Sequence, residues 1–481
     1  MGSNNGIPLS RRDRFVFQYP PFAAMQAGTR PDFSQPAPNK DEGFQLYVHI
    51  PFCAVRCTFC YFGIMPNTFR TVVNPYIEAL HKEIDMIAEL PYLQGRKVET
   101  VYFGGGTPTY LKEPQLEALI GHIREKFDIA DDYEWSCEGE PTTITEEKLR
   151  LLKDLGVTRM SFGVQSFHPD VATANGRIAK PHVVERTLNW AKEIGFRVVN
   201  VDLMSAMLGE TMDTWKHSLD RVLHFEPQHV TIYRMEIKPG TQFYTKLQFD
   251  PELRKTFVSD SMELDMVRLA EDRLGERGYR HHTHFSWVRS PEFEHTHRTN
   301  CWRGRDLIAL GESAFGYANG YLYQNANPHR PYVNIVEQGK IPQARARKLT
   351  ELERMTGYMT MGLKLLKIER ADFRARFGKD PLEVFGPEVG RLEASGAVTV
   401  DDAWIRVTEH GCLYADSFLK IFYQPEYRDM DELRVGTPPF HEMPMDVGDI
   451  STLLEAVASG RAAPVPEAAA AVAQPTQVQL R

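Results

Sequence analysis

The chain has 481 residues, of which 42% are hydrophobic and 25% are charged. This balance is ordinary for globular proteins and excludes disorder over the whole length. Lysine and arginine number 56 against 64 aspartate and glutamate residues, a net charge of −8, which makes a nucleic-acid partner unexpected. No apolar run approaches the roughly 18 residues of a membrane span, and no signal-peptide pattern occurs. We therefore expect a cytoplasmic protein that binds neither nucleic acid nor membranes.

The first 43 residues contain six prolines and show no sustained periodicity, which predicts an irregular arm. Four aromatic residues are expected to anchor this arm on a core: Phe15, Phe17, Tyr19 and Phe22. Further along, residues 301–350 are expected to form a connecting segment. Residues 351–450 predict a smaller, mainly helical, winged-helix-like C-terminal domain. Residues 459–481, rich in Ala, Pro and Gln, predict a disordered tail.

Between the arm and residue 300, strand and helix patterns alternate. Segments rich in β-branched and aromatic residues predict six strands, over residues 44–50, 98–103, 133–138, 159–164, 198–204 and 229–234. Helical periodicity predicts helices over residues 74–90, 114–127, 145–155, 183–194 and 211–225, the third beginning at a Thr145 cap. This order predicts an α/β fold, either an open doubly wound sheet or a partial or full (β/α) barrel. Ligands are then expected at the carboxyl ends of the strands.

Three of the six cysteines lie within one short loop after the first strand. Cys53, Cys57 and Cys60 have the spacing C-x3-C-x2-C, and three thiolates so arranged can hold three irons of a [4Fe–4S] cluster. The fourth iron would have no protein ligand and would be open to a substrate or cofactor. The alternatives are a zinc site completed by His49, or three thiols that bind nothing.

This loop and the segment Tyr47-Val-His-Ile-Pro-Phe before it resemble the radical S-adenosylmethionine (SAM) superfamily. More narrowly, residues 44–420 resemble the oxygen-independent coproporphyrinogen III oxidase-like family. The resemblance implies a radical SAM barrel in which the open iron chelates SAM, and it assigns Tyr47 and Phe59 to SAM binding. Cleavage of SAM would give a 5′-deoxyadenosyl radical, with electrons from a donor such as flavodoxin or ferredoxin.

A run of three glycines follows the second strand, in Gly104-Gly105-Gly106-Thr107. Glycines allow positive φ and close backbone approach to a ligand, although a tight structural turn has the same pattern. The run resembles the family's glycine-rich motif. The resemblance implies that Gly105 contacts the cluster-bound SAM, and that Gly106 and Thr107 face a second SAM molecule.

Four more residues match the family's SAM-binding positions. Glu138 ends the third strand in a Glu-x-x-Pro turn and can accept hydrogen bonds from ribose hydroxyls or an ammonium group. The resemblance implies that Gln165, Arg177 and Asp202 contact the second SAM. An arginine suits the carboxylate of its methionine moiety. The alternatives are a helix cap for Glu138 and ordinary salt bridges for the charged residues.

Two positions depart from the coproporphyrinogen oxidase pattern. This chain reads Cys60-Tyr61-Phe62 where the oxidase has Cys-Gly-Cys, and Glu236 stands where the oxidase has alanine. These departures favour a changed substrate. We therefore predict a class C methyl or methylene transferase, which moves the group from the second SAM to an sp2 carbon of an aromatic or conjugated metabolite. The product would be methylated or cyclopropanated, as in duocarmycin- and yatakemycin-type antibiotic pathways.

Three other functions remain open at this stage. They are coproporphyrinogen III oxidation, radical haem degradation, and haem binding by a chaperone with a ligand such as His49.

Five histidines lie between residues 281 and 297; we expect a solvated or substrate-facing loop there rather than a metal site. The Met-rich segment 355–363 predicts a helix that either packs in a core or forms a wall of the substrate chamber. No residue is identified as a catalytic base.

Overall fold

The computed structural model describes residues 16–68, 70–238, 240–428 and 430. The predicted disordered tail, Phe15 and the last part of the predicted C-terminal domain lie outside these residues. The described residues all belong to one compact unit, Met1–Thr437. None of their helices is long and apolar enough to cross a membrane.

Seven parallel strands form the centre of a sheet that has thirteen strands in the described part of the chain. In spatial order they are β12 (Leu307–Leu310), β2 (Phe44–Ile50), β5 (Val98–Gly105), β6 (Ile129–Gly139), β7 (Arg159–Gln165), β8 (Val198–Ser205) and β9 (His229–Arg234). The predicted bounds of the first and last of the six predicted strands, β2 and β9, are correct, and the other four differ only at their ends.

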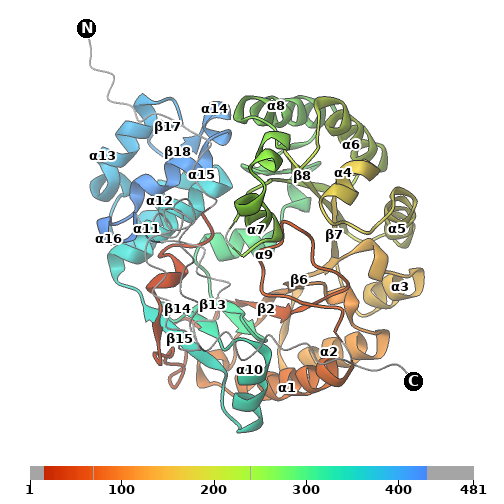
Figure 1. Ribbon diagram of the computed structural model, residues 1–481. Helices are drawn as coiled ribbons and strands as arrows, with labels where there is room; N and C mark the ends of the chain where they lie inside the picture. Colours follow the sequence, from red (N-terminus) through yellow and green to blue (C-terminus); the bar gives the residue numbers. More distant parts are fainter. Residues whose placement is uncertain (1–15, 69, 239, 429, 431–481) are drawn as a thin grey trace, which may run out of the picture. The chain divides into compact units, whose positions relative to one another are not determined.

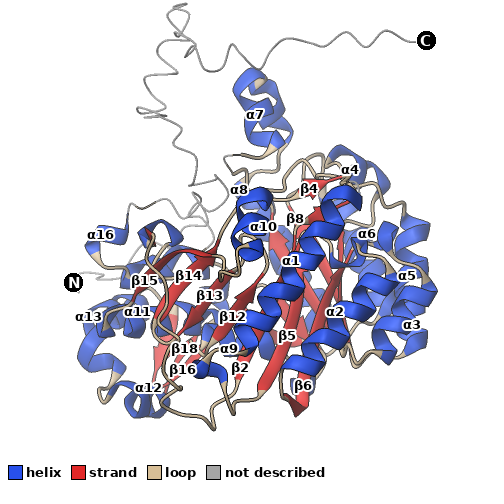
Figure 2. Cartoon of the chain, turned by 90° about the horizontal axis from the view of Figure 1, so that it is seen from below, coloured by secondary structure: helices blue, strands red, loops and turns tan. Residues whose placement is uncertain are grey.

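Helices cover the outer face of these strands, as Figures 1 and 2 show. They are α1 (Arg70–Ala88), α2 (Glu113–Lys126), α3 (Glu146–Asp154), α5 (Pro181–Ile194) and α6 (Met212–Phe225). Each agrees with a predicted helix, and Thr145 caps α3 by accepting a hydrogen bond from the backbone N–H of Lys148 (3.2 Å). Further helices lie between or after them: α4 (Pro169–Ala174), α7 (Gln242–Phe249), α8 (Asp260–Glu276), α9 (Thr296–Trp302) and α10 (His329–Glu337).

Apolar side chains on the outer face of the strands explain why the helices pack there. Val101, Phe103 and Trp135 are fully buried and pack in one core with Leu116 and Ile120 of α2. Many parallel strands are apolar on both faces, but here the inner face carries polar side chains at alternate positions. Glu138, Gln165 and Asp202 line the interior cavity, whereas Gln45 and His49 are buried.

Antiparallel strands extend the sheet on both sides. Beyond β12 lie β13 (Phe315–Ala318), β14 (Tyr321–Asn325), β15 (Gln343–Lys348) and β1 (Gln26–Ala27); beyond β9 lie β11 (Ser286–Val288) and β10 (Arg280–Thr283). Because β1 and β10 are edges that do not pair with each other, the sheet is a partial barrel and not a full one. The sheet continues past residue 300, through the segment for which the sequence predicts only a connection.

The C-terminal part has a small antiparallel sheet within short helices. Its strands are β16 (Lys367–Glu369), β18 (Trp404–Val407) and β17 (Val398–Val400), in that order. The helices are α11 (Glu351–Gly362), α12 (Arg370–Phe377), α13 (Pro381–Ala394), α14 (Glu409–Cys412), α15 (Ala415–Phe418) and α16 (Pro425–Arg428). Buried Met355, Met359 and Met361 of α11 pack in this core. The Met-rich helix is therefore a core element and not a chamber wall.

The N-terminal arm is anchored by aromatic residues, as predicted. Tyr19 is almost fully buried in the C-terminal core, and Phe22 stacks on Phe315 with ring centroids 3.8 Å apart. Lys364 Nζ donates a hydrogen bond to the carbonyl of Val16 (2.6 Å), which holds the start of the described arm on the C-terminal part.

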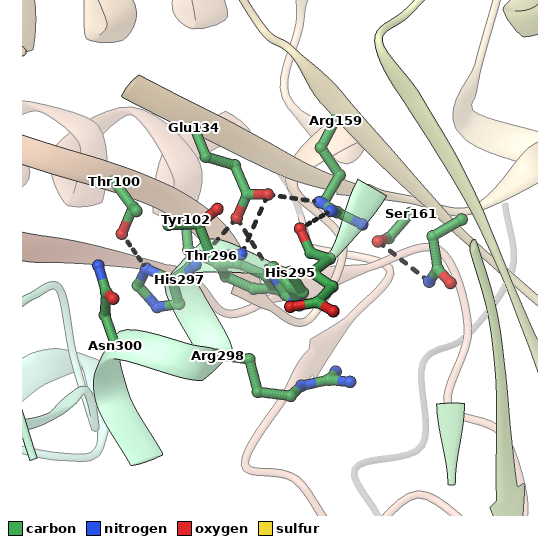
Figure 3. A network of polar contacts seen from close by, with 12 residues as sticks. Thr100, Tyr102, Glu134, Arg159, Ser161, His295, Thr296, His297, Arg298 and Asn300 are labelled. Carbon is green, nitrogen blue, oxygen red and sulfur yellow. Dashed lines mark hydrogen bonds and ion pairs between the residues drawn. The ribbon is translucent and has the colours of Figure 1, made fainter. Parts of the chain in front are cut away.

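The prediction of a solvated loop over the His-rich segment 281–297 is wrong, although His284 of this segment lines the cavity described below. This segment forms β10, β11 and the start of α9, and His282, His295 and His297 are buried. Figure 3 shows the reason: Glu134 accepts hydrogen bonds from the backbone N–H of His297 (3.0 Å) and from Arg159 Nε (2.9 Å). This buried charge pair satisfies polar groups that would otherwise require water.

Candidate active site

The cysteine loop leaves the carboxyl end of β2 and lies against the glycine turn after β5. The backbone N–H of Gly106 donates to the carbonyl of Ile50, and that of Thr107 to the carbonyl of Phe52, both over 2.8 Å. Cys53 then pairs in a short parallel ladder with Pro66. These main-chain contacts hold the first cysteine beside the glycine turn, where Thr107 Oγ1 lies 3.2 Å from Cys53 Sγ.

One cavity of about 510 Å³ opens inside the partial barrel. All of the residues predicted for cluster or SAM binding line it, with the exception of Tyr47: Cys53, Cys57, Phe59, Cys60, Gly105, Gly106, Thr107, Glu138, Gln165, Arg177 and Asp202. They come from five separate strands and the loops after them. The predicted site residues therefore meet at the carboxyl ends of the strands, as the fold class requires.

The donor set in the loop fits an iron–sulfur cluster. Burial raises the pKa of Cys53 to about 12 and that of Cys60 to about 11, so both thiols stay protonated until a metal displaces the proton. Arg177 Nη1 donates to Cys57 Sγ over 3.3 Å, which supplies positive charge beside this anionic ligand set. The cysteine side chains all face the cavity, which leaves room for a ligand on a fourth iron.

The geometry does not single out the alternative zinc site. Among the described residues, no three His, Cys, Asp or Glu side chains, the three cysteines of the loop included, are already gathered around one metal position. His49, which would complete such a site, contacts the hydroxyl of Tyr47 through Nδ1 (3.0 Å). Burial lowers the pKa of His49 to about 4, so its imidazole is neutral.

Glycine is required at two positions of the turn. Gly105 has φ +105°, which L-residues rarely adopt, and a Cβ on Gly106 would lie 2.7 Å from the carbonyl oxygen of Phe52. The turn is thus pressed against the cysteine loop, and its backbone faces the cavity. A side chain at either position would push the loop and the turn apart.

Glu138 is a partly buried carboxyl group whose hydrogen-bond partner is a tyrosine. Tyr102 donates a hydrogen bond to Glu138 Oε1 over 2.5 Å. Burial is the main cause that raises the pKa of Glu138 to about 7; the charge of Asp202 acts in the same direction, and the hydrogen bond from Tyr102 acts against it. Tyr47 stacks on Tyr102 with centroids 6.0 Å apart, so it supports Glu138 from behind the cavity wall.

Arg177, Gln165 and Asp202 approach the cavity from the next strands. Arg177 forms an ion pair with Glu140 (3.2 Å) and donates to the carbonyl of Gly163. Gln165 has φ +68° and a buried Oε1 with no hydrogen-bond partner in the described residues. Asp202 accepts from Asn200 Nδ2 over 2.8 Å, and burial raises its pKa. These groups form a polar wall that can receive a ligand carrying both charge signs.

Sequence reasoning missed several residues of the cavity: Arg298 and Trp302 reach it from α9, and Asp416 from α15 of the C-terminal part. His284, from the segment expected to be solvated or substrate-facing, reaches it from the turn after β10. His284 Nε2 and Asp416 Oδ2 lie 3.0 Å apart. No motif marks these positions, because they belong to elements that only the folded chain brings together.

Comparisons with known proteins agree with this architecture. Residues 47–222 match the model of the radical SAM superfamily, and residues 349–414 match that of the HemN C-terminal domain. The coproporphyrinogen III oxidase HemN of Escherichia coli has a similar structure, with a TM-score of 0.75 and 25% identity over 84% of this chain and 96% of that one. The chain is thus similar to the radical SAM superfamily and, within it, to HemN-like proteins.

Two kinds of protein occur among the curated relatives of this chain. The heme chaperone HemW of Bacillus subtilis is 28% identical over 378 residues, which are 78% of this chain and 98% of the relative. The oxygen-independent coproporphyrinogen III oxidase of Pseudomonas aeruginosa is 27% identical over 399 residues, which are 78% and 85% of the two chains. The predicted radical SAM α/β fold with a smaller C-terminal domain is therefore confirmed, and this fold implies a [4Fe–4S] cluster and SAM.

The predicted methyl or methylene transferase is wrong, because the relatives act on haem or coproporphyrinogen. The prediction rested on Tyr61 and Glu236, and the structure gives both another explanation. Glu236 pairs with Lys238 (2.9 Å), whose ammonium lies 4.4 Å from the Tyr61 ring and 4.0 Å from that of Phe17. The two departures thus belong to a contact between the cavity rim and the N-terminal arm.

Proposed function

We propose that this chain is a radical SAM enzyme that oxidises the propionate side chains of a porphyrinogen to vinyl groups. The observation that carries the proposal is the continuous cavity from the cysteine loop to α14 and α15, with the SAM-type residues at one end. The similarity of this chain to a coproporphyrinogen III oxidase extends over both the barrel and the C-terminal part. An enzyme of this class requires all of these parts together.

Cys53, Cys57 and Cys60 would hold the cluster. When bound and reduced, such a cluster would supply the electron for cleavage of SAM to methionine and a 5′-deoxyadenosyl radical. In the proposal, Gly105 and Phe59 contact the first SAM, and Glu138, supported by Tyr102 and Tyr47, accepts hydrogen bonds from its ribose or ammonium group. A flavodoxin or ferredoxin would be the electron donor.

A second SAM molecule is part of the proposal. Gly106, Thr107, Gln165, Arg177 and Asp202 line the cavity next to the first set. The buried Oε1 of Gln165 without a partner in the described residues, and the guanidinium of Arg177, suit the ammonium and carboxylate of a methionine moiety. The proposal of a second SAM molecule rests on these groups.

The reaction has a simple balance. Each propionate gives up one hydrogen atom to the 5′-deoxyadenosyl radical, then one CO2 and one electron, and becomes a vinyl group. The electron passes to a one-electron acceptor. The chain's own contribution is to hold the side chain near SAM and to exclude water, which the buried aromatic and apolar lining from Phe285, Trp287 and Leu413 supports.

Anaerobic incubation of the reconstituted protein with SAM, a reductant and coproporphyrinogen III tests the proposal. We expect vinyl-containing products, CO2 and 5′-deoxyadenosine, measured by liquid chromatography with mass spectrometry. The absence of any vinyl product while SAM is cleaved would contradict it. SAM that carries deuterium in its methyl group is the matched control: deuterium should not appear in 5′-deoxyadenosine.

A second candidate is a haem chaperone, favoured by the match to HemW over 98% of that relative's length. The same incubation separates the two functions. Stoichiometric haem binding and transfer to an acceptor protein, without a vinyl product, would support the chaperone.

A further inference from the structure

Helix α9 places one arginine in the cavity from an unusually well-anchored position. Glu134 accepts hydrogen bonds from the backbone N–H of Thr296 (3.4 Å) and of His297 (3.0 Å). Arg159 forms an ion pair with Glu134 (2.9 Å) and donates to the carbonyl of Glu294 (2.8 Å), just before the helix. Figure 3 shows the guanidinium of Arg298 pointing away from this network. The network fixes the helix while Arg298 extends into the cavity.

The cationic side chains that line the cavity differ in whether they form an ion pair with a carboxylate. In the described residues they are Arg177, Arg234, Lys238 and Arg298. Three of them form ion pairs with carboxylates: Arg177 with Glu140 (3.2 Å), Arg234 with Glu263 (3.2 Å) and Lys238 with Glu236 (2.9 Å). Arg298 forms no ion pair with any described residue. Its charge is therefore the one in this lining that lacks a carboxylate partner from the described chain.

The surroundings of Arg298 hold its guanidinium without neutralising it. The ring centroids of Phe285 and Trp302 lie 5.1 and 5.8 Å from its Cζ, and Nη2 donates to the hydroxyl of Tyr233 over 3.3 Å. Nη1 is buried and has no hydrogen-bond partner among the described residues. Burial lowers the pKa of Arg298, but Tyr233, Tyr102 and Asp202 raise it by more, so the side chain stays charged.

Asp202 is near enough to raise the pKa of Arg298, but no described carboxylate lies within ion-pair distance of its guanidinium, and Nη1 is buried without a hydrogen-bond partner. This arrangement is costly, since buried charged groups are normally paired or fully hydrogen-bonded. Aromatic side chains on a guanidinium and a fixed helix reduce the entropy lost when it binds an anion. A planar carboxylate is the group whose two oxygens match an arginine best. Each of the other three cations forms an ion pair with an acidic side chain of the protein, but no described acidic side chain lies within ion-pair distance of Arg298.

We propose that Arg298, with Tyr233, forms a carboxylate-binding subsite in the floor of the cavity. The carboxylate bound there can come from two ligands. One is a propionate group of the tetrapyrrole, and this choice rests on the proposed function. The other is the carboxylate of a SAM molecule. The subsite fixes which side chain of the ligand lies next to Glu138 and the cysteine loop, so Arg298 is a specificity-determining residue.

Binding measurements on the reconstituted full chain test this subsite. The variants are Arg298→Met, Arg298→Gln in case the first does not fold, and Arg305→Met as the matched control, since Arg305 pairs with Glu99 outside the cavity lining. The probes are coproporphyrin III, its tetramethyl ester and SAM. We expect Arg298→Met to weaken binding of the free acid by roughly 10- to 100-fold, with the ester and SAM unchanged. Arg305→Met should change none of the three.

Each outcome has a distinct meaning. Weaker SAM binding with unchanged porphyrin binding supports the subsite and identifies its carboxylate as that of SAM. Unchanged affinity for every probe that the wild type binds overturns the subsite, even if the wild type forms vinyl products. Conversely, a loss of affinity in Arg298→Met, in a protein whose wild type forms no vinyl product, retains the subsite and rejects the porphyrinogen reaction.

Discussion

Arg177 Nη1 donates a hydrogen bond to Cys57 Sγ over 3.3 Å, and Nη2 of the same guanidinium pairs with Glu140 over 3.2 Å. One side chain therefore connects the cysteine loop with the polar wall at the end of β6. Arg177 follows α4, and the backbone N–H of Thr58 donates to the carbonyl of Asn175 just before it (3.3 Å). The loop and the SAM-type residues are thus held as one unit.

Arg177→Gln is expected to lower the reduction potential of the cluster. A positive charge beside a cluster ligand stabilises the reduced, more negative state, and the substitution removes that charge. SAM cleavage should fall about 10-fold or more, in the range typical for groups that contact a metal ligand. A redox titration followed by electron paramagnetic resonance measures the potential. An unchanged potential at full iron content would contradict the expected role.

Cys57→Ala is expected to remove the iron–sulfur absorbance and all cleavage of SAM. Two thiolates cannot hold the three irons that the loop provides for. Cys301→Ala is the matched control, because Cys301 lies on α9 and outside the loop, and this variant should retain its cluster. Iron and sulfide content, together with the visible spectrum, measure the result. Equal iron content in the two variants would overturn the cluster assignment.

The affinity for SAM is expected to rise as the pH passes through about 7. Burial raises the pKa of Glu138 to this value, so the carboxyl group is protonated below it and ionised above it. The ionised form accepts charge-assisted hydrogen bonds and attracts the sulfonium of SAM. Glu138→Gln should flatten the pH profile between pH 6 and 8 and weaken binding at pH 8 by about 10-fold. Calorimetric titration with SAM measures both effects, and an identical profile in the variant would exclude Glu138 as the titrating group.

The strands around the cavity could be predicted because their residues carry the signal locally. β2 and β9 have the predicted bounds, and the cysteine, glycine and Glu138 positions follow strands whose carboxyl ends must meet at one edge. The residues from the later part of the chain could not be predicted in this way. Arg298 lies on a seven-residue helix whose sequence, Thr-His-Arg-Thr-Asn-Cys-Trp, has no apolar periodicity.

Buried charge explains why the segment around Arg298 looks like a solvated loop in the sequence. Several of its backbone and side-chain groups have partners more than a hundred residues away, as when Glu134 accepts a hydrogen bond from the backbone N–H of His297. Hydrophobic patterning cannot detect an element that is buried through ion pairs and hydrogen bonds. In the same way, the sequence alone interprets Glu236 as a sign of a changed substrate. The structure shows instead that Glu236 pairs with Lys238, whose ammonium lies over the ring of Phe17.

Glu83 provides a test of the fold that is independent of the active site. It is fully buried on α1, and its carboxyl group accepts hydrogen bonds from the hydroxyl of Tyr332 (2.6 Å), the backbone N–H of Gly311 (2.7 Å) and Asn325 Nδ2 (2.7 Å). Burial raises its pKa from 4.5 to about 7 in spite of these donors. The native state therefore binds a proton more tightly than the unfolded chain does.

This raised pKa predicts the sign of a pH effect. As the pH rises from 4.5 to 7, the unfolded chain releases the proton of Glu83 first, so the free energy of unfolding falls by up to about 3 kcal/mol. Glu83→Gln cannot titrate and should lack this decline, although its amide satisfies the three donors less well and lowers stability at pH 5. Urea unfolding of both proteins at pH 5, 6, 7 and 8 gives the difference, in which other titrating groups cancel. A difference that stays constant over this range would mean that Glu83 has an ordinary pKa in the native state, and that its three donors outweigh its burial.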